Sequence, residues 1–351
     1  QLIGKACTRS GLAPEQVADM CVVGNTAMHH LFLGIEAQFL AKSPFPPAVN
    51  SPCDFRARDL GLRINPAANV HLLPNVAGFV GADCVADVIA TGIYDQKELT
   101  LLIDIGTNGE LVLGNQSLGL VACSAAAGPA FEGAHIQYGM RAASGAIEHV
   151  HIDPATYEVT CQVIGGAPAR GICGSGIIDA IAEMLRTGII SVSGRMNTEI
   201  VCPRIRKGQR GSEFVLEWAN RTAVGEDIVM TQADVREVQL AKGAFYAGTK
   251  MLMKSLGVER VDRVLLAGAF GSYLDPKAAM SIGLFPSCKI ENVVALGNTA
   301  GYGARMALLS ASKRAEAAAI AAKMRYIELT VCPDFQGAFV AGTKFPAATG
   351  G

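Results

Sequence analysis

The sequence predicts an α/β fold built from two related halves, and three observations support this. First, the string Gly-Asn-Thr-Ala occurs at 24–27 and again at 297–300. Each copy follows a short apolar run and precedes a helical pattern, so the matching contexts indicate an internal duplication. Second, short apolar strand patterns and amphipathic helical patterns both recur along the chain. Third, residues 99–114 form a strand–turn–strand pattern with Asn-Gly in the turn.

The two repeated turns each place an Asn and a Thr before a helix. Asn25 or Thr26 would cap the first helix, and Asn298 or Thr299 would cap the second, which is a purely structural role. The alternative is a functional role, in which these residues contact a ligand where the two halves meet. Both roles stay open at this point.

The stretch 99–114 carries one carboxylate, Asp104, to a turn of small residues between two apolar runs. The turn comprises Gly106, Thr107, Asn108 and Gly109. A simple β-hairpin explains the pattern. A phosphate-binding loop explains it too, because small residues let backbone N–H groups approach an anion and Asp104 can hold a hydrated Mg²⁺ beside it.

A third strand is predicted from Leu118 and leads into an alanine-rich turn that ends at Gly128. Pro129 then favours the first turn of a short helix that contains Glu132. Close packing would account for such a turn. A helix start is also a natural seat for phosphate, and Glu132 could orient a water or a metal there.

Farther along, His149, His151 and Asp153 would share one face of a strand. A solvated strand face is a far commoner reason for this spacing than a metal site. A glycine-rich turn at 171–176 precedes a helix that ends at Gly188. This turn would either cradle phosphate or let the helix pack closely.

The remaining segments give five further expectations. Residues 191–231 are rich in charge and read as a surface insertion, and a capping-box pattern at 231–234 starts a long helix that ends at Gly257. A buried strand from 261 opens into Gly268 and Gly271, which would leave room for a flat ligand. A helix is expected over 307–324 and a closing strand pair over 326–345.

Composition excludes several classes of protein. The chain has 351 residues, of which 50% are hydrophobic and 17% charged, as in a globular protein. Its formal net charge of −1 lacks the excess of positive charge that is typical of nucleic-acid-binding proteins. No apolar run is long enough to span a membrane. None of the ten cysteines are two residues apart, so we expect small buried thiols in a reducing cytoplasm rather than a metal cluster.

In this order, the elements resemble the superfamily of actin, sugar kinases and heat-shock ATPases. The resemblance implies two RNase-H-like mixed β-sheet halves flanked by helices, with ATP between them. It implies that 104–110 is the second phosphate loop and that Gly268 and Gly271 belong to the adenosine loop. The first phosphate loop should precede residue 24 and is not found, so the resemblance implies an incomplete first half and a truncated amino end. We therefore expect 1–98 to be the remainder of the first half, 99–300 the second half, and 301–351 a helix and closing strands that return to the first half.

Five segments together resemble, more closely, the reductive activators of corrinoid proteins: 24–34, 104–110, 125–133, 171–176 and 266–271. This implies ATP-dependent reduction of cob(II)amide to cob(I)amide in a corrinoid protein partner, with a [2Fe–2S] cluster only in a region before Gln1. A homodimer stays open.

On this resemblance Asp104 holds Mg²⁺ through water and Glu132 orients the attacking water. The implied ATP contacts are Gly106, Thr107, Asn108, Gly109, Gly128, Asn25, Thr26, Asn298, Gly268 and Gly271. Two alternatives remain, namely a small-metabolite kinase of the same fold and a corrinoid-protein docking module without turnover.

Overall fold

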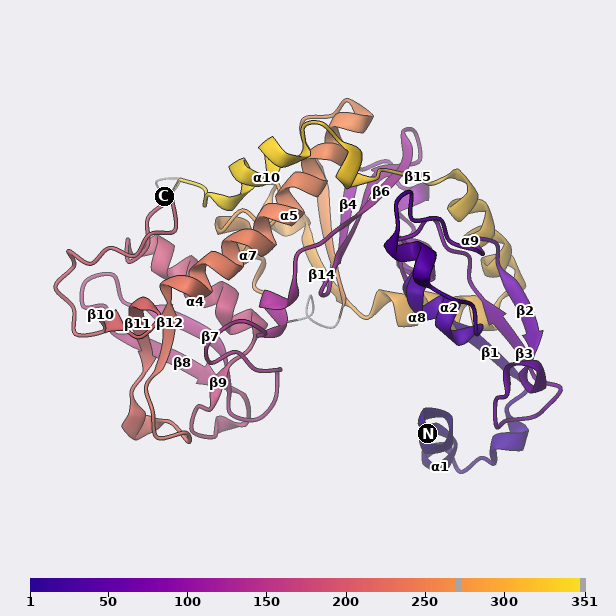
Figure 1. Cartoon of the computed structure of the whole chain (residues 1–351), viewed down its shortest axis with the longest axis horizontal. Coiled ribbons are helices and arrows are strands. Elements are labelled where there is room, and N and C mark those ends of the chain that lie inside the picture. The colour runs from indigo at the N-terminus through magenta and orange to yellow at the C-terminus, as the bar shows by residue number, and fades with distance from the viewer. Residues whose placement is uncertain (269–272, 348–351) are drawn as a thin grey trace. The chain divides into compact units, whose positions relative to one another are not determined.

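The computed structural model describes residues 1–268 and 273–347 of the chain (Figure 1). The chain divides into two compact units. The first unit comprises Gln1–Lys97, Gly114–Cys123 and Asn298–Tyr326, and the second comprises Glu98–Leu113, Ser124–Gly297 and Ile327–Gly351. The assignment of 1–98, 99–300 and 301–351 to two RNase-H-like halves stays a prediction.

The first unit is built on a small mixed sheet with the strand order β1-β3-β2, in which β1 runs parallel and β2 antiparallel to β3. Its strands are β1 (Asp19–Val22), β2 (Cys53–Arg56) and β3 (Asn69–Leu72). Its helices are α1 (Leu2–Ser10), α2 (Thr26–Phe32), α3 (Ala82–Thr91), α8 (Thr299–Leu309) and α9 (Ala311–Lys323). Val70 and Leu72 of the central strand are fully buried and anchor the core of this unit.

Helices α3 and α8 of the first unit pack closely against each other. A side chain at Gly303 of α8 would overlap the backbone carbonyl of Ala86 in α3, so only glycine fits there. Beside this contact the buried Thr299 hydroxyl donates a hydrogen bond to the Asp87 carboxylate. These contacts explain why α8, although more than 200 residues later in the sequence, belongs to the same unit as α3.

The largest sheet has the strand order β14-β13-β4-β5-β6-β15. Its strands are β4 (Thr100–Ile105), β5 (Gly109–Asn115), β6 (Gly119–Ala125), β13 (Arg263–Ala267), β14 (Val293–Gly297) and β15 (Arg325–Tyr326). Strand β13 runs parallel to both β4 and β14, and β15 runs parallel to β6. The residues of β4 from Thr100 to Ile103 are at most 1% exposed, as expected for a strand covered on both faces. Strand β15 and most of β6 belong to the first unit, and the other strands of this sheet lie mainly in the second.

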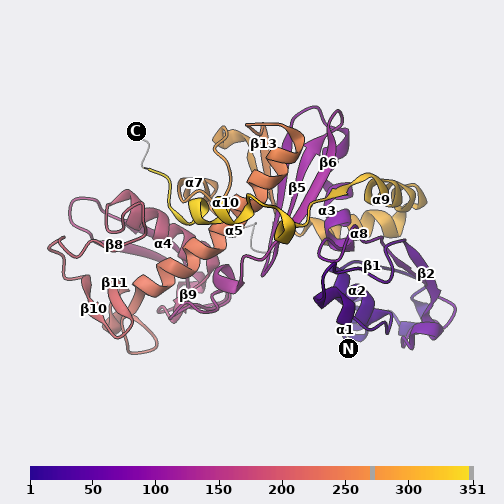
Figure 2. The same cartoon turned by 45° about the horizontal axis from the view of Figure 1, so that its top comes forward.

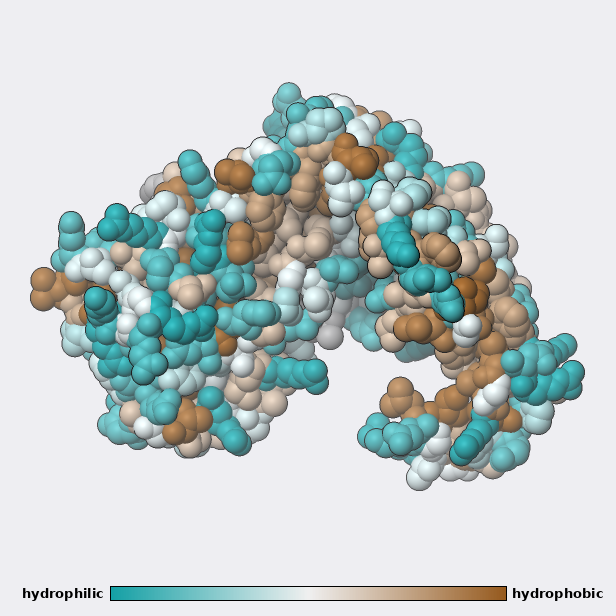
Figure 3. All heavy atoms as spheres, in the orientation of Figure 1, coloured by the Kyte–Doolittle hydropathy of each residue, from teal (hydrophilic) through white to brown (hydrophobic). Residues whose placement is uncertain are grey.

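Two smaller sheets belong wholly to the second unit. Strands β7 (Ala146–Ile152), β8 (Val159–Val163) and β9 (Gly171–Ile172) have the order β8-β7-β9, and helix α4 (Gly174–Arg186) packs on β7. The charge-rich segment 191–231 folds into the antiparallel strands β10 (Ile205–Gly208), β11 (Gly211–Glu217) and β12 (Ile228–Thr231). Figure 3 shows hydrophilic side chains gathered over the part of the molecule that carries these three strands.

The second unit also holds α5 (Gln232–Leu256), α7 (Pro276–Ser281) and α10 (Phe335–Thr343). The predicted start of the long helix α5 is confirmed, because the Thr231 hydroxyl accepts from the Asp234 amide at 3.1 Å and the Asp234 carboxylate accepts from the Thr231 amide at 2.9 Å. Its end at Gly257 is confirmed as well, since this residue has φ +68°. The short 3-10 helices of the chain are Pro14–Gln16, Gln38–Ala41, Ala57–Leu60, Ile93–Asp95, Pro129–Glu132, Ile164–Gly166, Ala219–Arg221, Ile290–Asn292 and Leu329–Val331.

The closing strand pair expected over 326–345 is wrong. Only Arg325–Tyr326 is a strand, and Phe335–Thr343 forms helix α10, which lies alongside α5 in both views (Figures 1 and 2). The physical reason is close packing of the two helices, because Gly342 of α10 lies against Tyr246 of α5 and Gly243 of α5 lies against the backbone of α10. Among the described residues, none of the helices combines the length and the apolar character needed to cross a membrane.

Candidate functional site

Strand β4 carries Asp104 to the start of an exposed turn. Asp104 itself is half-buried, whereas Thr107 and Asn108 are exposed. The Gly106 amide donates to the Asn108 carbonyl at 3.1 Å and closes the turn before β5 begins. The predicted strand–turn–strand element at 99–114 is therefore confirmed.

Gly268 lies directly against Asp104, although 163 residues separate them in the sequence. The parallel register of β4 and β13 places Ala267 opposite Asp104, so the residue that follows β13 comes close to the start of the turn. Gly268 has φ +89°, and a Cβ atom there would overlap Asp104 Oδ1 and lie 3.0 Å from the Ile105 carbonyl. Only glycine satisfies both the backbone conformation and this close approach. Gly271, predicted beside it, lies outside the described residues.

A second turn is tied to the first by Glu132. The 3-10 helix η5 (Pro129–Glu132) follows the predicted turn at Gly128, and the Thr107 hydroxyl donates to Glu132 Oε1 at 2.5 Å. The structure therefore brings Asp104, Thr107, Glu132 and Gly268 into one neighbourhood of the second unit. Each of these four residues was predicted from its local motif alone.

Gly109 and Gly128 are glycines for different reasons. Gly109 is buried, and a Cβ atom there would overlap the ring of Phe245 in α5, so packing accounts for its lack of a side chain. Gly128 has φ +76° with open space around it, so backbone conformation alone demands glycine. Contact of either residue with phosphate stays a prediction.

In both repeated turns it is the Asn that caps the helix. Asn25 accepts from the Met28 amide at 2.9 Å and Asn298 accepts from the Gly301 amide at 2.8 Å. The threonines do something else, since Thr26 donates to the Ala77 carbonyl at 2.7 Å and Thr299 donates to Asp87.

Both repeated turns also contact helix α3 of the first unit. A side chain at Gly81, just before α3, would approach the Asn25 backbone to 2.6 Å, and Thr299 reaches Asp87 within the same helix. Asn25, Thr26 and Asn298 therefore belong to the first unit, whereas Asp104 and Gly268 belong to the second. Their predicted contact with a nucleotide stays a prediction.

The two histidines on β7 pair with carboxylates of α4. His149 Nδ1 lies 2.8 Å from Asp179 Oδ2, and His151 Nδ1 lies 2.9 Å from Glu183 Oε2. Burial raises the pKa of Asp179. Asp153 instead closes the following turn by accepting from the Ala155 and Thr156 amides. Within 1–268 and 273–347, no group of three or more His, Cys, Asp or Glu side chains could hold a metal ion.

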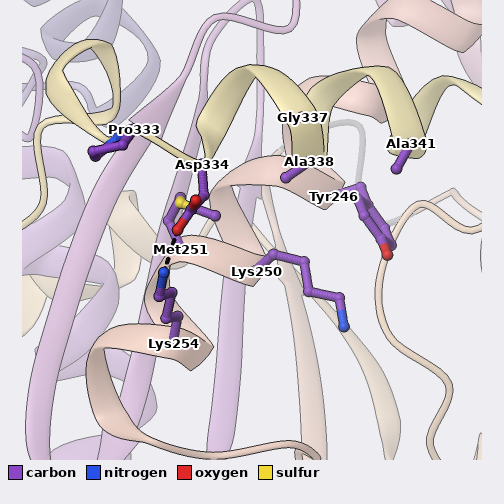
Figure 4. Close-up of a pocket in the computed structure, with 9 residues that line it drawn as sticks. All are labelled: Tyr246, Lys250, Met251, Lys254, Pro333, Asp334, Gly337, Ala338 and Ala341. Atoms are coloured by element: carbon purple, nitrogen blue, oxygen red, sulfur yellow. Dashed lines mark hydrogen bonds and ion pairs between the residues drawn. The ribbon is translucent and has the colours of Figure 1, made fainter.

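A groove of about 530 Å³ lies between α5 and α10, apart from these predicted residues (Figure 4). An ion pair between Lys254 and Asp334 bridges one end of the groove. The Lys250 ammonium lies 5.7 Å from the ring centre of Tyr246, within reach of a cation–π interaction. The full lining is Tyr246, Lys250, Met251, Lys254, Pro333, Asp334, Gly337, Ala338 and Ala341.

The fold and the family of the chain are both defined by comparison with known proteins. Residues 98–350 match an actin-like ATPase domain, known as the ASKHA domain. The matching family descriptions are "C-terminal domain of RACo the ASKHA domain" for residues 98–350 and "RACo middle region" for residues 1–96. The chain therefore belongs to the RACo family, the reductive activators of corrinoid proteins.

Three similar proteins carry names in the same class. The chain is 36% identical over 354 residues to the corrinoid activation enzyme RamQ of Eubacterium limosum, covering 98% of this chain and 59% of that protein. It is 30% identical over 277 residues to the [Co(II) methylated amine-specific corrinoid protein] reductase of Methanosarcina barkeri, covering 72% and 46%. A solved structure titled "Reductive activator for corrinoid,iron-sulfur protein" matches with a TM-score of 0.89 and 43% identity, covering 99% of this chain and 55% of that one. The chain thus spans about half the length of these relatives.

Proposed function

We propose that this chain is the ATP-binding and partner-docking region of a reductive activator, which returns the cob(II)amide of a corrinoid protein to cob(I)amide. The observation that carries the proposal is the convergence of Asp104, Thr107 and Gly268, which follow β4 and β13, with Glu132 of η5. The names of the similar proteins support the choice of partner.

The residues of this site fit a magnesium nucleotide. Asp104 would hold Mg²⁺ through water, because a single carboxylate that leaves the other positions to water and phosphate is typical of this ion. Thr107 and Asn108 would face the phosphates with their backbone N–H groups. The Gly106 amide donates to the Asn108 carbonyl, so Gly106 would contribute the close approach that its lack of a side chain permits. The bare backbone at Gly268 lets the end of β13 lie directly against Asp104, and the resemblance places this loop beside the adenosine.

The remaining predicted contacts extend the same proposal. Glu132 would orient the water that attacks the γ-phosphate, and its hydrogen bond to Thr107 keeps its carboxylate beside the phosphate turn. Gly109 and Gly128 shape the two turns, and Gly271 would complete the adenosine loop. Nucleotide contacts of Asn25, Thr26 and Asn298 stay what the resemblance implies.

Nucleotide binding matters here because reduction of cob(II)amide is thermodynamically uphill for an ordinary ferredoxin-type donor. Free energy from ATP binding or hydrolysis would shift the activator between states that differ in affinity for the corrinoid protein. The electron itself would come from a [2Fe–2S] cluster in another region of the whole protein, as the resemblance implies. A homodimer and a cytoplasmic location also stay predictions.

Calorimetric titration of the chain with ATP and with ADP, both in excess Mg²⁺, tests the nucleotide site. We expect saturable binding by the unchanged chain and at least about tenfold weaker binding by Asp104→Asn, which keeps the shape and removes the charge. Asp59→Asn, an exposed carboxylate of the first unit, is the matched control and should bind as the unchanged chain does. Equal affinities for all three chains would refute the assignment of Asp104.

A phosphate-release assay separates ATPase function from the two alternatives. The proposal predicts that a corrinoid protein stimulates release without a small-molecule acceptor. Release that depends on such an acceptor would indicate a kinase, and binding without release would indicate a docking module.

A further inference from the structure

The ring of Phe245 lies beneath both turns of the candidate site. Phe245 is in the middle of α5 and is fully buried. On one side its ring occupies the space where a side chain at Gly109 would lie, directly after the phosphate turn. On another side its ring centre is 6.2 Å from that of Phe131, the residue before Glu132.

The two turns are therefore held together by two separate links. At the surface, Thr107 donates its hydrogen bond to Glu132. In the core, Gly109 and Phe131 both contact Phe245. The surface link joins flexible side chains in contact with water, whereas the core link is fixed by close packing, so the core link is the stiffer of the two.

We infer that Phe245 is a positioning residue for the nucleotide, because it sets the separation between the phosphate turn and the turn that carries Glu132. Because the ring is fully buried, it would act on the nucleotide through Gly109 and Phe131 rather than by direct contact. This inference deepens the proposed function and rests on it for the identity of the ligand.

The contact between Phe245 and Gly109 also offers a test by size exchange. A methyl group at Gly109 has no space while the ring is present, so Gly109→Ala should push the phosphate turn away from α5. Phe245→Ala removes the ring and leaves a cavity that such a methyl group partly fills. The two changes should therefore compensate in the double variant, a coupling that independent sites do not show.

The matched control is Phe214→Ala. Phe214 is another fully buried phenylalanine of the second unit, but it lies in β11 of the three-stranded antiparallel sheet. Its loss should destabilise the fold by an amount similar to that of Phe245→Ala. It should leave the ATP affinity within about twofold of the unchanged chain, as expected for a distant site.

MgATP affinity is measured by calorimetry, and stability is measured by urea unfolding. Both are measured on the unchanged chain, on the single variants Phe245→Ala, Phe214→Ala and Gly109→Ala, and on the double variant of Gly109→Ala with Phe245→Ala. We expect Phe245→Ala to weaken ATP binding by about tenfold or more, since a displacement of about 1 Å is costly in a preorganised site. The double variant should bind ATP more tightly than the two single changes predict together. The milder Phe245→Leu keeps the inference testable if Phe245→Ala fails to fold.

Hydrogen exchange of the amides at 106–109 gives a readout that needs no ligand. These amides should exchange faster in Phe245→Leu than in Phe214→Leu at equal global stability. Failure of the unchanged chain to bind ATP would overturn the proposed function, while the exchange result would still decide whether Phe245 holds the turn. The inference would be overturned if the variants at Phe245 and those at Phe214 showed the same amide exchange rates at 106–109 and the same ATP affinity.

Discussion

Replacement of Gly268 by alanine tests the close approach of the β13 end to Asp104. Two costs follow from the geometry. At φ +89° an alanine is strained by about 1–2 kcal/mol. Its methyl group would also overlap Asp104 Oδ1, and relieving this overlap by a backbone or side-chain shift costs about 1–3 kcal/mol more.

Gly257→Ala separates these two costs. Gly257 has φ +68° at the end of α5, but nothing lies within 4 Å of the position that its Cβ atom would occupy. It therefore carries the conformational strain without the overlap. The difference in free energy of unfolding between the two variants, measured by urea denaturation, isolates the cost of displacing Asp104.

The same pair of variants reports on the site. If Gly268 keeps Asp104 in position for Mg²⁺, Gly268→Ala should weaken MgATP binding by at least about tenfold. Gly257→Ala should leave the affinity unchanged, and calorimetry measures both. Equal MgATP affinities in the two variants, with a larger stability loss in Gly268→Ala, would show that Asp104 is displaced without consequence and would refute the reasoning.

Three further predictions concern buried polar groups. Burial lowers the pKa of Lys242 to about 8 from 10.5, so the unfolded chain binds more protons between these values and stability should rise by about 1 kcal/mol from pH 8 to 9. Urea unfolding should show this rise in the unchanged chain but not in Lys242→Met. Among the described residues His29 offers no hydrogen bond from either buried ring nitrogen, so His29→Leu should raise the free energy of unfolding by about 1 kcal/mol, and a loss would contradict this. Thr299→Val should cost about 1–3 kcal/mol in the same assay because it removes the buried donor to Asp87, and an unchanged midpoint would speak against that bond.

Local elements of the fold were predictable because their signals lie within a few residues. The strand–turn–strand element around Asp104 was identified by two apolar runs and an Asn-Gly turn. The long helix was identified by its capping box at Thr231 and its closing Gly257. Helix α10 was missed because a short, almost wholly apolar segment fits the residue spacing of a helix and of a strand equally well. Only its packing on α5 selects the helix.

The sequence by itself determined the kinds of turn and the residues that they carry, because glycine, proline and short polar side chains act on their own backbone. It therefore identified Asp104, Glu132 and Gly268 one by one. Only the tertiary structure decided that Gly268 lies against Asp104 and that Phe245 underlies Gly109. These contacts depend on strand register and helix packing between segments more than 100 residues apart, and no local pattern encodes them.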